Sequence, residues 1–483
     1  MLFNSIDFVI FLPIVFILYW FVLNKNLRIQ NFLLVVASYV FYGWWDWRFL
    51  SLIAFSTIVD YTLGILLDKE ENEKKRKLYL WTSISINLGF LGFFKYYNFF
   101  VDSFVEAFTF FGQEIKVETL YIILPVGISF YTFQTLSYTI DVYKKKLEPT
   151  KKIVAFAAFV SFFPQLVAGP IERASNLLPQ ILQKRKLNYC QSKEGLRLIL
   201  WGLFKKVVIA DSLAPIVNDI FTNYEMHSSP VLIMGAVFFA FQIYGDFSGY
   251  SDIAIGTAKL FGIELMSNFK FPYLSRNIGE FWRRWHISLS TWFRDYLYIP
   301  LGGSKESKVI GIRNVFIIFL VSGFWHGANW TFVFWGLFHA LLFLPSFLLG
   351  TNRKYKNDAS LSSFNILKVF SNVYNTLLTF ILVTIGWVFF RSNTLTDSFA
   401  YLKIIFTDFS VENYIHPNGY RLIDYFLLLL FFLVYEYIIR NNERNPIAFK
   451  NRYLRLAMYI LLVFLMLLFY DDGVDRSFIY FQF

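Results

Sequence analysis

The stretch NVFIIFLVSGFWHGANWTFVFWGLFHALLFLPSFLL, residues 314–349, contains no Lys, Arg, Asp or Glu. A helix needs roughly 20 predominantly apolar residues to cross the hydrocarbon core of a bilayer. This run exceeds that length, and Gly323 and Gly327 near its middle permit a helix break or a close backbone approach. The stretch therefore predicts a membrane-embedded helical segment that crosses either once or twice.

The composition extends this conclusion to the whole chain. Of its 483 residues, 56% are apolar, 21% aromatic and 16% charged. A soluble protein carries about a quarter charged residues, so the composition excludes a water-soluble globular protein. We expect an all-α polytopic membrane protein with about 11 or 12 transmembrane helices plus re-entrant or interfacial helices. The other predicted spans are residues 6–23, 31–45, 49–67, 78–94, 119–143, 195–221, 231–247, 368–390, 422–439 and 456–470.

The net charge of +11 carries information about topology. Basic residues gather in the cytoplasmic loops of membrane proteins, and we therefore do not expect a nucleic-acid partner. Segments 69–77 and 144–152 are basic and are predicted to lie inside, whereas the acidic segment 95–118 is predicted to be an external loop. The N-terminus is then external, and because residues 1–5 lack a charged leader, the first apolar run should remain as a helix.

Parity decides how residues 314–349 cross the membrane. Segments 268–313 and 440–455 are both basic and are predicted to lie inside, so an even number of crossings must separate them. Residues 314–349 must then cross twice, with a break near residues 323–329. The tail, residues 471–483, is predicted to lie outside.

A second apolar run, residues 153–168, has basic segments on both sides. A single crossing would place one of these segments outside, so we predict a re-entrant or interfacial segment that closes at Gly169-Pro170. Irregular backbone at membrane depth is tolerated only beside protein or a water-filled cavity.

The lone cysteine, Cys190, provides neither a disulfide nor a cysteine-based metal site. We expect one domain, residues 1–483.

His326 is the first candidate for chemistry. Two glycines flank it closely, Trp325 and Trp330 supply apolar walls, and Asn329 offers an amide. Burial in such surroundings keeps an imidazole neutral, which is the state that a general base needs. The alternative is a histidine that only satisfies its hydrogen bonds at a tight helix crossing.

His286 is the second candidate. It lies in the stretch FWRRWHISLSTWFRDYLYIPLGG, residues 281–303, which predicts an amphipathic helix in the membrane interface. The basic residues of this stretch, Arg283, Arg284 and Arg294, are candidates for binding an anionic ligand such as the phosphates of coenzyme A. The alternative is that they only anchor the helix at the interface.

Three strings together resemble a known family: Trp282-Arg283-Arg284-Trp285-His286, Trp325-His326-Gly327-Ala328-Asn329-Trp330, and residues 242–252, QIYGDFSGYSD. The chain resembles the membrane-bound O-acyltransferase family, and within it the bacterial alginate O-acetyltransferase branch, over nearly its whole length. Peptidoglycan O-acetyltransferases and the D-alanyl transferase of teichoic acid modification are also similar. The resemblance implies a central tunnel, with the family's histidine at His326 and the second histidine at His286.

The resemblance also implies roles for these residues. His326 is expected to accept the proton of an acceptor hydroxyl as it attacks the thioester of acetyl-coenzyme A. His286 would orient the donor or bond to the oxyanion, and Asn329 is a weaker candidate for the same task. Acetyl-coenzyme A is expected as a substrate, with no bound cofactor and no metal. The residues expected to support the site are Asn329, Trp325, Trp285 and Asp246.

Further expectations concern the surroundings of the enzyme. The branch implies the cytoplasmic (inner) membrane of the cell, contact with membrane lipid, an extracytoplasmic esterase-like partner, and a cell-surface glycan such as an alginate-like polysaccharide or peptidoglycan as acceptor. Four of the last six residues are aromatic, so the terminus should dock back into the protein. Tyr480 in this tail is a candidate acyl relay, the alternative being anchoring alone.

Two other functions stay open from the sequence. One is D-alanyl transfer to teichoic acid from a carrier protein, which would use the same histidines. The other is a proton-coupled transporter or channel, which predicts paired intramembrane carboxylates and inverted repeats. The sequence has no repeat, and Asp60 and Asp246 are the main acids in its central apolar runs.

Overall fold

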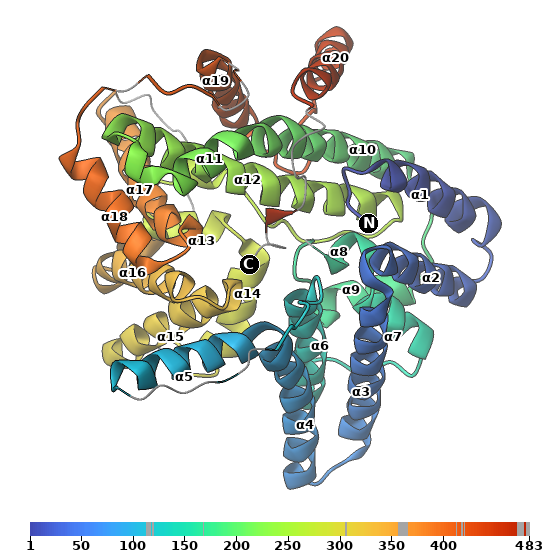
Figure 1. Cartoon of the computed structure of the whole chain (residues 1–483). Coiled ribbons are helices and arrows are strands. Elements are labelled where there is room, and N and C mark those ends of the chain that lie inside the picture. The colour runs from blue at the N-terminus through green and yellow to red at the C-terminus, as the bar shows by residue number, and fades with distance from the viewer. Residues whose placement is uncertain are drawn as a thin grey trace. The chain divides into compact units, whose positions relative to one another are not determined.

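The computed structural model of the chain describes residues 1–112, 117, 120–167, 169–304, 307–355, 366–411, 413–416, 419, 421–470 and 478–479. Within these ranges every regular element is a helix (Figure 1), which confirms the all-α prediction. Two compact units are present, and two helices, α10 and α12, contribute residues to both. The first unit comprises Met1–Ile199 and Ile253–Met266, and the second comprises Leu200–Asp252 and Ser267–Phe483.

The first unit begins with a helix that changes from α1 (Ile6–Ile17) to a π-helical turn (Leu18–Val22). Its other helices are α2 (Leu27–Asp46), a 3₁₀ turn (Trp47–Phe49), α3 (Leu50–Lys69), α4 (Glu73–Leu91), a π-helical turn (Gly92–Tyr96), α5 (Tyr97–Phe110), α6 (Ile128–Tyr143), α7 (Ile153–Val160), α8 (Phe163–Leu166), α9 (Ala174–Leu182) and most of α10 (Tyr189–Phe204).

The second unit holds both candidate histidines. After the end of α10 come η4 (Lys205–Asp211, π-helical), α11 (Ser212–Thr222), a 3₁₀ turn (Tyr224–Met226), α12 (Ser229–Leu260), a 3₁₀ turn (Pro272–Leu274), α13 (Ile278–Arg284), α14 (Ile287–Phe293), a π-helical turn (Arg294–Tyr298), α15 (Lys308–His326), α16 (Trp330–Leu348), a 3₁₀ turn (Thr351–Arg353), α17 (Ile366–Arg391), α18 (Leu395–Thr407), α19 (Leu422–Ile439) and α20 (Arg452–Leu468).

Six helical segments among the described residues are long and apolar enough to cross a membrane, and the chain is a multi-pass membrane protein. They are Leu27–Lys69, Ser229–Leu260, Lys308–His326, Trp330–Leu348, Leu367–Arg391 and Leu422–Ile439. The last coincides with the predicted span 422–439, and the first joins the predicted spans 31–45 and 49–67. The predicted spans 231–247 and 368–390 lie within Ser229–Leu260 and Leu367–Arg391, and 314–349 corresponds to Lys308–His326 and Trp330–Leu348. The remaining predicted spans correspond to helices that are shorter, more polar or interrupted by π-helical turns, namely 6–23, 78–94, 119–143, 195–221 and 456–470.

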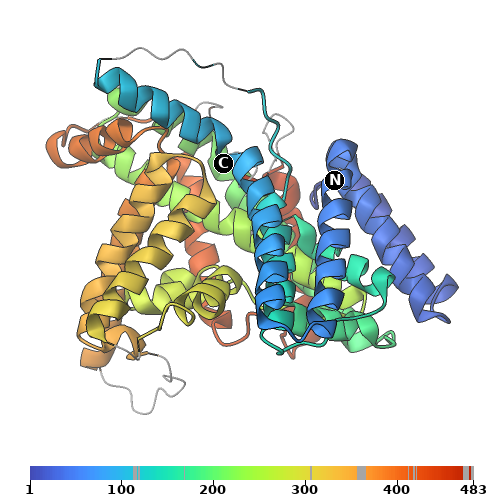
Figure 2. The same ribbon diagram turned by 90° about the horizontal axis from the view of Figure 1, so that it is seen from below.

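The apolar run 314–349 forms a helical hairpin, as parity predicts. α15 ends at His326, residues 327–329 connect, and α16 begins at Trp330. The two helices run side by side in both views (Figures 1 and 2) and pack along their length. A Cβ at Gly323 would lie 2.2 Å from the Phe332 carbonyl oxygen, and one at Gly336 would lie 2.3 Å from that of Phe319. Only glycine fits at these crossing points, so the hairpin owes its close packing to them.

Residues 153–168 do not form a membrane-crossing helix, in agreement with the prediction of a re-entrant or interfacial segment. They contain two short helices, α7 and α8, of 8 and 4 residues. At 1.5 Å per residue neither can cross a bilayer core of about 30 Å. Most of their side chains are buried against α2, α3 and α9 of the first unit.

Two sequence predictions about elements are wrong. Segment 95–118, expected to be a loop, contains α5, whose 14 residues include no buried side chain, while its external position stays a prediction. Residues 281–303, expected to form one amphipathic helix, break into α13, α14 and a π-helical turn. Both predictions used only charge and apolar spacing. These patterns do not indicate a helix on the surface, or a helix break caused by hydrogen bonds to a neighbouring non-helical segment.

Asp60, one of the two intramembrane acids noted in the sequence, has a structural environment in the first unit. Its carboxylate is fully buried and accepts hydrogen bonds from Ser83 Oγ at 2.5 Å, Asn87 Nδ2 at 2.9 Å and Thr139 Oγ1 at 3.2 Å. These groups come from α4 and α6, which pack against α3. A buried charge is tolerable when it is satisfied in this way, so Asp60 ties three helices together.

Candidate active site

His326 is the last residue of α15, at the turn of the hairpin. It is 3% exposed and lies among aromatic rings: the ring centroids of Trp325, Trp335 and Phe390 are 4.9, 5.1 and 5.4 Å away. Gly327 follows with an extended backbone and ends the helix. A Cβ there would lie 2.1 Å from the Phe332 ring. The hairpin turn therefore holds the imidazole inside an aromatic box.

His286 lies at the break between α13 and α14 rather than inside a helix. Its φ of +42° is in the left-handed region, which non-glycine residues rarely occupy and which is found preferentially at functional sites. Backbone hydrogen bonds on either side impose this conformation: Lys270 N donates to Arg284 O at 3.0 Å, and Ile287 N donates to Asn268 O at 2.9 Å. The extended residues 268–270 thus hold the His286 backbone in place.

Asn268 also fixes the protonation pattern of the His286 ring. Its Oδ1 accepts from the Ser288 backbone N–H at 3.4 Å and from Ser288 Oγ at 2.9 Å. Because a backbone N–H can only donate, this atom is the amide oxygen. His286 Nδ1, 3.0 Å from the same oxygen, must therefore carry the proton. The neutral ring then presents Nε2 as an acceptor.

The environment of His286 keeps this ring neutral. The residue is 1% exposed, and burial lowers the pKa of its imidazole to about 3. Its Nε2 is buried and has no hydrogen-bond partner among the described residues. A buried polar atom without a partner costs about 1–3 kcal/mol, so this atom is suited to bond to a ligand.

The structure brings the two predicted histidines together from segments 40 residues apart in sequence. Their ring centroids are 6.4 Å apart at an interplanar angle of 55°. Trp325 contacts both rings, at 4.9 Å from His326 and 5.8 Å from His286. One reacting group can therefore contact both imidazoles, in surroundings that exclude water and strengthen electrostatic interactions.

Two of the other predicted residues have structural partners. Trp285 is completely buried and packs against Phe269 and Trp387 at ring distances of 5.0 and 4.9 Å. Asn329 caps α16, because its Oδ1 accepts from Thr331 N at 3.0 Å while its Nδ2 donates to Asn393 O at 2.9 Å. The amide of Asn329 thus holds the hairpin turn to the segment after α17.

The three predicted donor-binding arginines differ in their surroundings. Arg283 donates to Asn352 O at 2.5 Å, and Arg284 pairs with Glu280 at 2.7 Å. Arg294 pairs with its neighbour Asp295 at 2.7 Å and also lines a cavity of about 240 Å³. Arg353, which no sequence motif marked, lines the same cavity. Two of the guanidinium groups therefore support the fold, and Arg294 and Arg353 face a binding space.

This small cavity lies near His326, although His326 does not line it. Ser322, which also lines it, lies one helical turn before His326 on α15. Trp282, another lining residue, contacts Trp335 at a ring distance of 5.6 Å, and Trp335 contacts His326. The indole Nε1 of Trp282 is buried without a hydrogen-bond partner in the described part of the chain. The cationic side chains that line the cavity therefore share it with Trp282, which contacts the aromatic box through Trp335.

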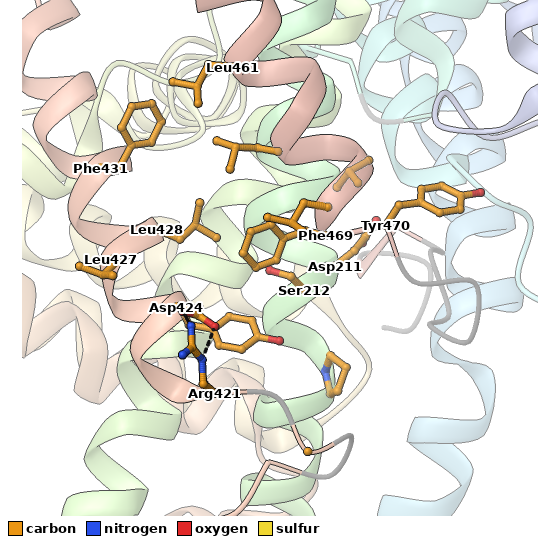
Figure 3. A pocket seen from close by; sticks show the side chains of 16 residues that line it. Asp211, Ser212, Arg421, Asp424, Leu427, Leu428, Phe431, Leu461, Phe469 and Tyr470 are labelled. Carbon is orange, nitrogen blue, oxygen red and sulfur yellow. Dashed lines mark hydrogen bonds and ion pairs between the residues drawn. The ribbon is translucent and has the colours of Figure 1, made fainter.

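A larger cavity, of about 760 Å³, lies elsewhere in the second unit (Figure 3). Leucine and phenylalanine side chains of α19 and α20 line it, together with Asp211 and Ser212. Neither histidine is among its lining residues. We therefore assign the chemistry to the neighbourhood of the smaller cavity, because position relative to the reactive groups matters more than volume.

Asp246 lies close to the histidine site. Its Oδ1 pairs with Lys206 Nζ at 2.7 Å, and its Oδ2 accepts from the backbone N–H of Ile479 at 2.6 Å. The next residue, Phe247, contacts the His286 ring edge-on at 4.6 Å. Sequence reasoning marked Asp246 but missed Lys206, whose position in an apolar span was the available signal.

Two further predictions concern metal binding and the C-terminal tail. Within the residues that the structure describes, no group of three or more His, Cys, Asp or Glu side chains is arranged to hold a metal ion. Tyr480, the predicted acyl relay, lies outside the described residues.

Comparisons with known proteins show that the chain is similar to membrane-bound acyltransferases. The model of the "MBOAT, membrane-bound O-acyltransferase family" matches residues 149–385. The chain is 42% identical to a Pseudomonas syringae pv. tomato protein named "Probable alginate O-acetylase AlgI", over 82% of this chain and 73% of that protein. It is 37% identical to a Helicobacter pylori peptidoglycan O-acetyltransferase, over 83% and 79%. A Streptococcus thermophilus teichoic acid D-alanyltransferase is 31% identical, over 45% and 55%.

Proposed function

The chain belongs to the membrane-bound O-acyltransferase family, and we propose that it moves acetyl groups from cytoplasmic acetyl-coenzyme A across the membrane for O-acetylation of a cell-surface polysaccharide. The relatives named for O-acetylation match most of the chain, whereas the D-alanyltransferase matches less than half of it. This difference favours acetyl over D-alanyl as the transferred group.

The observation that carries the proposal is the facing pair of histidines. His326 and His286 are both buried, their ring centroids are 6.4 Å apart, and the Nε2 atom of His286 has no hydrogen-bond partner among the described residues. A neutral imidazole is the group that most often acts as general base at neutral pH. Two such groups in one aromatic box supply a base and a second hydrogen-bonding group for acyl transfer.

In the proposed reaction the acceptor hydroxyl oxygen attacks the thioester carbonyl carbon of acetyl-coenzyme A. His326 takes the hydroxyl proton as the new C–O bond forms, so that no free alkoxide arises in a low-dielectric site. The C–S bond then breaks, and the proton passes from His326 to the departing thiolate. His286, whose neutral ring presents Nε2 as an acceptor, orients the donor by accepting a hydrogen bond.

The cavity lined by Arg294 and Arg353 is the proposed donor entrance. Arginine binds phosphate oxygens with charge-assisted hydrogen bonds, and coenzyme A carries phosphates at one end and the thioester at the other. With the phosphates at Arg294 and Arg353, the thioester end would reach past Trp282 toward His326. Arg283 and Arg284 contribute positive potential while bonded to Asn352 and Glu280.

The second half of the transfer is proposed to occur outside the cytoplasm. The enzyme would lie in the cytoplasmic membrane as one functional domain, in contact with lipid, and would work with an extracytoplasmic esterase-like partner. In the sharper form of this proposal the Tyr480 hydroxyl receives the acetyl group as an ester, with release of coenzyme A, and passes it on to the partner. The acceptor would be an alginate-like polysaccharide or peptidoglycan, as the names of the relatives suggest.

The test is transfer of label from [¹⁴C]acetyl-coenzyme A by the purified full-length protein in proteoliposomes. We expect label on protein or polysaccharide, release of one free thiol per acetyl transferred, and no competition from a D-alanyl carrier protein. Competition by that carrier would favour D-alanyl transfer, and absence of transfer with either donor would contradict the proposal.

The relay has its own test, because Tyr480→Phe removes only one hydroxyl. We expect this variant to lose surface acetylation while it still binds acetyl-coenzyme A. Phe481→Tyr, which adds a hydroxyl at the neighbouring position, serves as a control in the Tyr480→Phe background and should not restore transfer. Intact surface acetylation by Tyr480→Phe would contradict the relay.

A further inference from the structure

The last described residues of the chain are buried in the second unit. Phe478 is 0% and Ile479 6% exposed. The Phe478 ring packs against Tyr250 at 4.6 Å and Phe247 at 5.7 Å, both on α12. The Ile479 backbone N–H donates to Asp246 Oδ2 at 2.6 Å. These residues are therefore docked by aromatic contacts and by one hydrogen bond to a carboxylate.

The carboxylate that receives this hydrogen bond is itself held in place. Asp246 Oδ1 pairs with Lys206 Nζ at 2.7 Å, and the same ammonium pairs with Asp211 Oδ1 at 2.8 Å. Lys206 is 1% and Asp246 2% exposed. Hydrogen bonds with a charged partner are roughly twice as strong as neutral ones, and removal of one partner from a buried pair is costly. The group Asp211–Lys206–Asp246 is thus a rigid anchor.

The local backbone brings Lys206 to this position. Lys206 lies in η4, a π-helical segment, and such segments often occur at functional sites. Two glycines of α12 let η4 approach closely: a Cβ at Gly249 would lie 2.8 Å from the Gly202 carbonyl oxygen, and one at Gly245 would lie 3.0 Å from that of Lys205. Lys205 pairs separately with Asp252, at 2.7 Å. Two neighbouring lysines therefore bind two different aspartates of α12.

The anchor is adjacent to the proposed active site. Phe247, the residue after Asp246, contacts the Phe478 ring on one side and the His286 ring, at 4.6 Å, on another. The docked terminus and His286 therefore share a neighbour. A shift of Phe478 would free space beside Phe247 and loosen the wall that holds His286.

We propose that Lys206 and Asp246 form a clamp that positions Phe478 and Ile479 beside Phe247 and His286, so that these two residues are a fixed part of the transfer site. The clamp rests on the proposed function, because its purpose is to hold Phe478 and Ile479 beside the proposed site of acyl transfer. Lys206 and Asp246 are positioning residues, since they act through the docked terminus rather than on the substrate.

The test uses the full-length protein with its single cysteine replaced, Cys190→Ser, and a reporter thiol introduced by Ile479→Cys, which keeps the backbone N–H. A buried thiol reacts with a maleimide only when the terminus opens. We expect Asp246→Ala to increase the labelling rate roughly tenfold, the effect of losing a hydrogen bond to a charged acceptor. Lys206 stays paired with Asp211 in this variant, which protects the fold.

The matched control is Asp252→Ala. It also removes an aspartate of α12 that pairs with a lysine of η4, but this partly exposed side chain is not the one that accepts the hydrogen bond of Ile479. Its labelling rate should stay within about twofold of the parent, since this change leaves the hydrogen bond between Ile479 and Asp246 in place. Equal labelling rates in the parent and Asp246→Ala, or equal increases in both aspartate variants, would overturn the clamp.

A second measurement separates positioning from general damage. Asp246→Ala should bind a non-hydrolysable thioether analogue of acetyl-coenzyme A within about twofold of the parent while acetyl transfer falls at least tenfold, because only the docked terminus is displaced. Loss of analogue binding and of transfer together would assign Asp246 a structural role and overturn the clamp. The labelling measurement needs no activity, so failure of the proposed function would leave it readable.

Discussion

At the scale of single residues, the decisive feature is the pairing of His286 with Asn268. The amide oxygen of Asn268 accepts from Ser288 N–H, from Ser288 Oγ and from His286 Nδ1. This arrangement selects one tautomer and one ring orientation, much as the residues behind a catalytic histidine do in other enzymes. The chemistry assigned to His286 therefore depends on a residue that does not touch the substrate.

The first prediction concerns this pairing. Asn268→Ala should lower kcat for acetyl transfer by about a hundredfold, because a small displacement of a catalytic group costs about that much. Ser288→Ala, which removes one hydrogen bond to Asn268 but leaves the His286 contact, should lower kcat less than tenfold. Steady-state kinetics of the two variants check this, and equal kinetics for Asn268→Ala and the parent would contradict the assigned role.

The second prediction concerns pH. Burial lowers the pKa of His286 to about 3 in the folded protein. In the unfolded chain the same imidazole binds a proton near pH 6.5, so the unfolded state is the more protonated one below this pH. Stability should therefore fall as the pH drops from about 6.5 toward 3, by at most about 1.4 kcal/mol per pH unit for this group. His286→Gln should lose less stability than the parent between pH 7 and pH 5. Thermal unfolding in detergent measures this difference, and identical pH slopes would argue against a neutral buried His286.

Residue-level sequence reasoning found His326, His286 and Asp246 but not their partners. The two histidines were marked by tryptophans, glycines and a family resemblance, all of which are visible in a string. Asn268 carries no such mark, and Lys206 is marked only by its charge within an apolar span. Their contacts form only when residues 268–270 pair with the backbone beside His286 and η4 packs on α12. Tertiary contact, and not local pattern, gives them the roles that we propose.

At the scale of elements, the hairpin of α15 and α16 determines the position of His326. Charge parity predicted this hairpin, because two basic loops had to lie on one side of the membrane. The parity argument rests on the summed charge of whole loops, so a change in one residue does not alter its result. The break at His286 and the helix α5 depend on single backbone interactions or on surface packing, and the sequence pattern could not register them.

The third prediction tests the hairpin. Gly323→Ala would place a methyl group 2.2 Å from the Phe332 carbonyl oxygen, so α15 and α16 must separate. We expect a loss of about 1–3 kcal/mol in stability, the usual cost of overpacking, together with reduced transfer as His326 shifts.

The control for this prediction is Gly89→Ala in α4, where no atom lies within 4 Å of the added Cβ. An exposed helical glycine replaced by alanine should gain up to about 1 kcal/mol. The thermal unfolding midpoints of the two variants, measured in the same detergent, test this difference in stability. A Gly323→Ala protein as stable as Gly89→Ala would contradict the close helix packing.

At the scale of the whole molecule, the charge distribution predicts which face meets the donor. The basic loops, including residues 144–193, are expected on the cytoplasmic side, where acetyl-coenzyme A is found. The acidic segment 95–118 is expected on the opposite side. The acceptor cannot be deduced in the same way, because no side chain in the described region identifies a particular sugar.

The fourth prediction uses the single native cysteine. Cys190 is exposed at the start of α10, within the segment expected inside. A membrane-impermeant maleimide should therefore label it in inside-out vesicles and not in intact spheroplasts. A cysteine introduced by Asp102→Cys in the Cys190→Ser background should show the reverse pattern. Labelling of Cys190 in intact spheroplasts would contradict the topology.

Acetyl transfer by a His326→Ala enzyme tests the assigned active site most directly. The parent and the variant are compared in proteoliposomes with [¹⁴C]acetyl-coenzyme A, after equal folding is established by size-exclusion profile and thermal midpoint. Loss of a general base should reduce transfer by about 10²–10⁴-fold while binding of a thioether analogue of the donor persists. Transfer by His326→Ala at the rate of the parent would contradict the assignment of the reaction to this site.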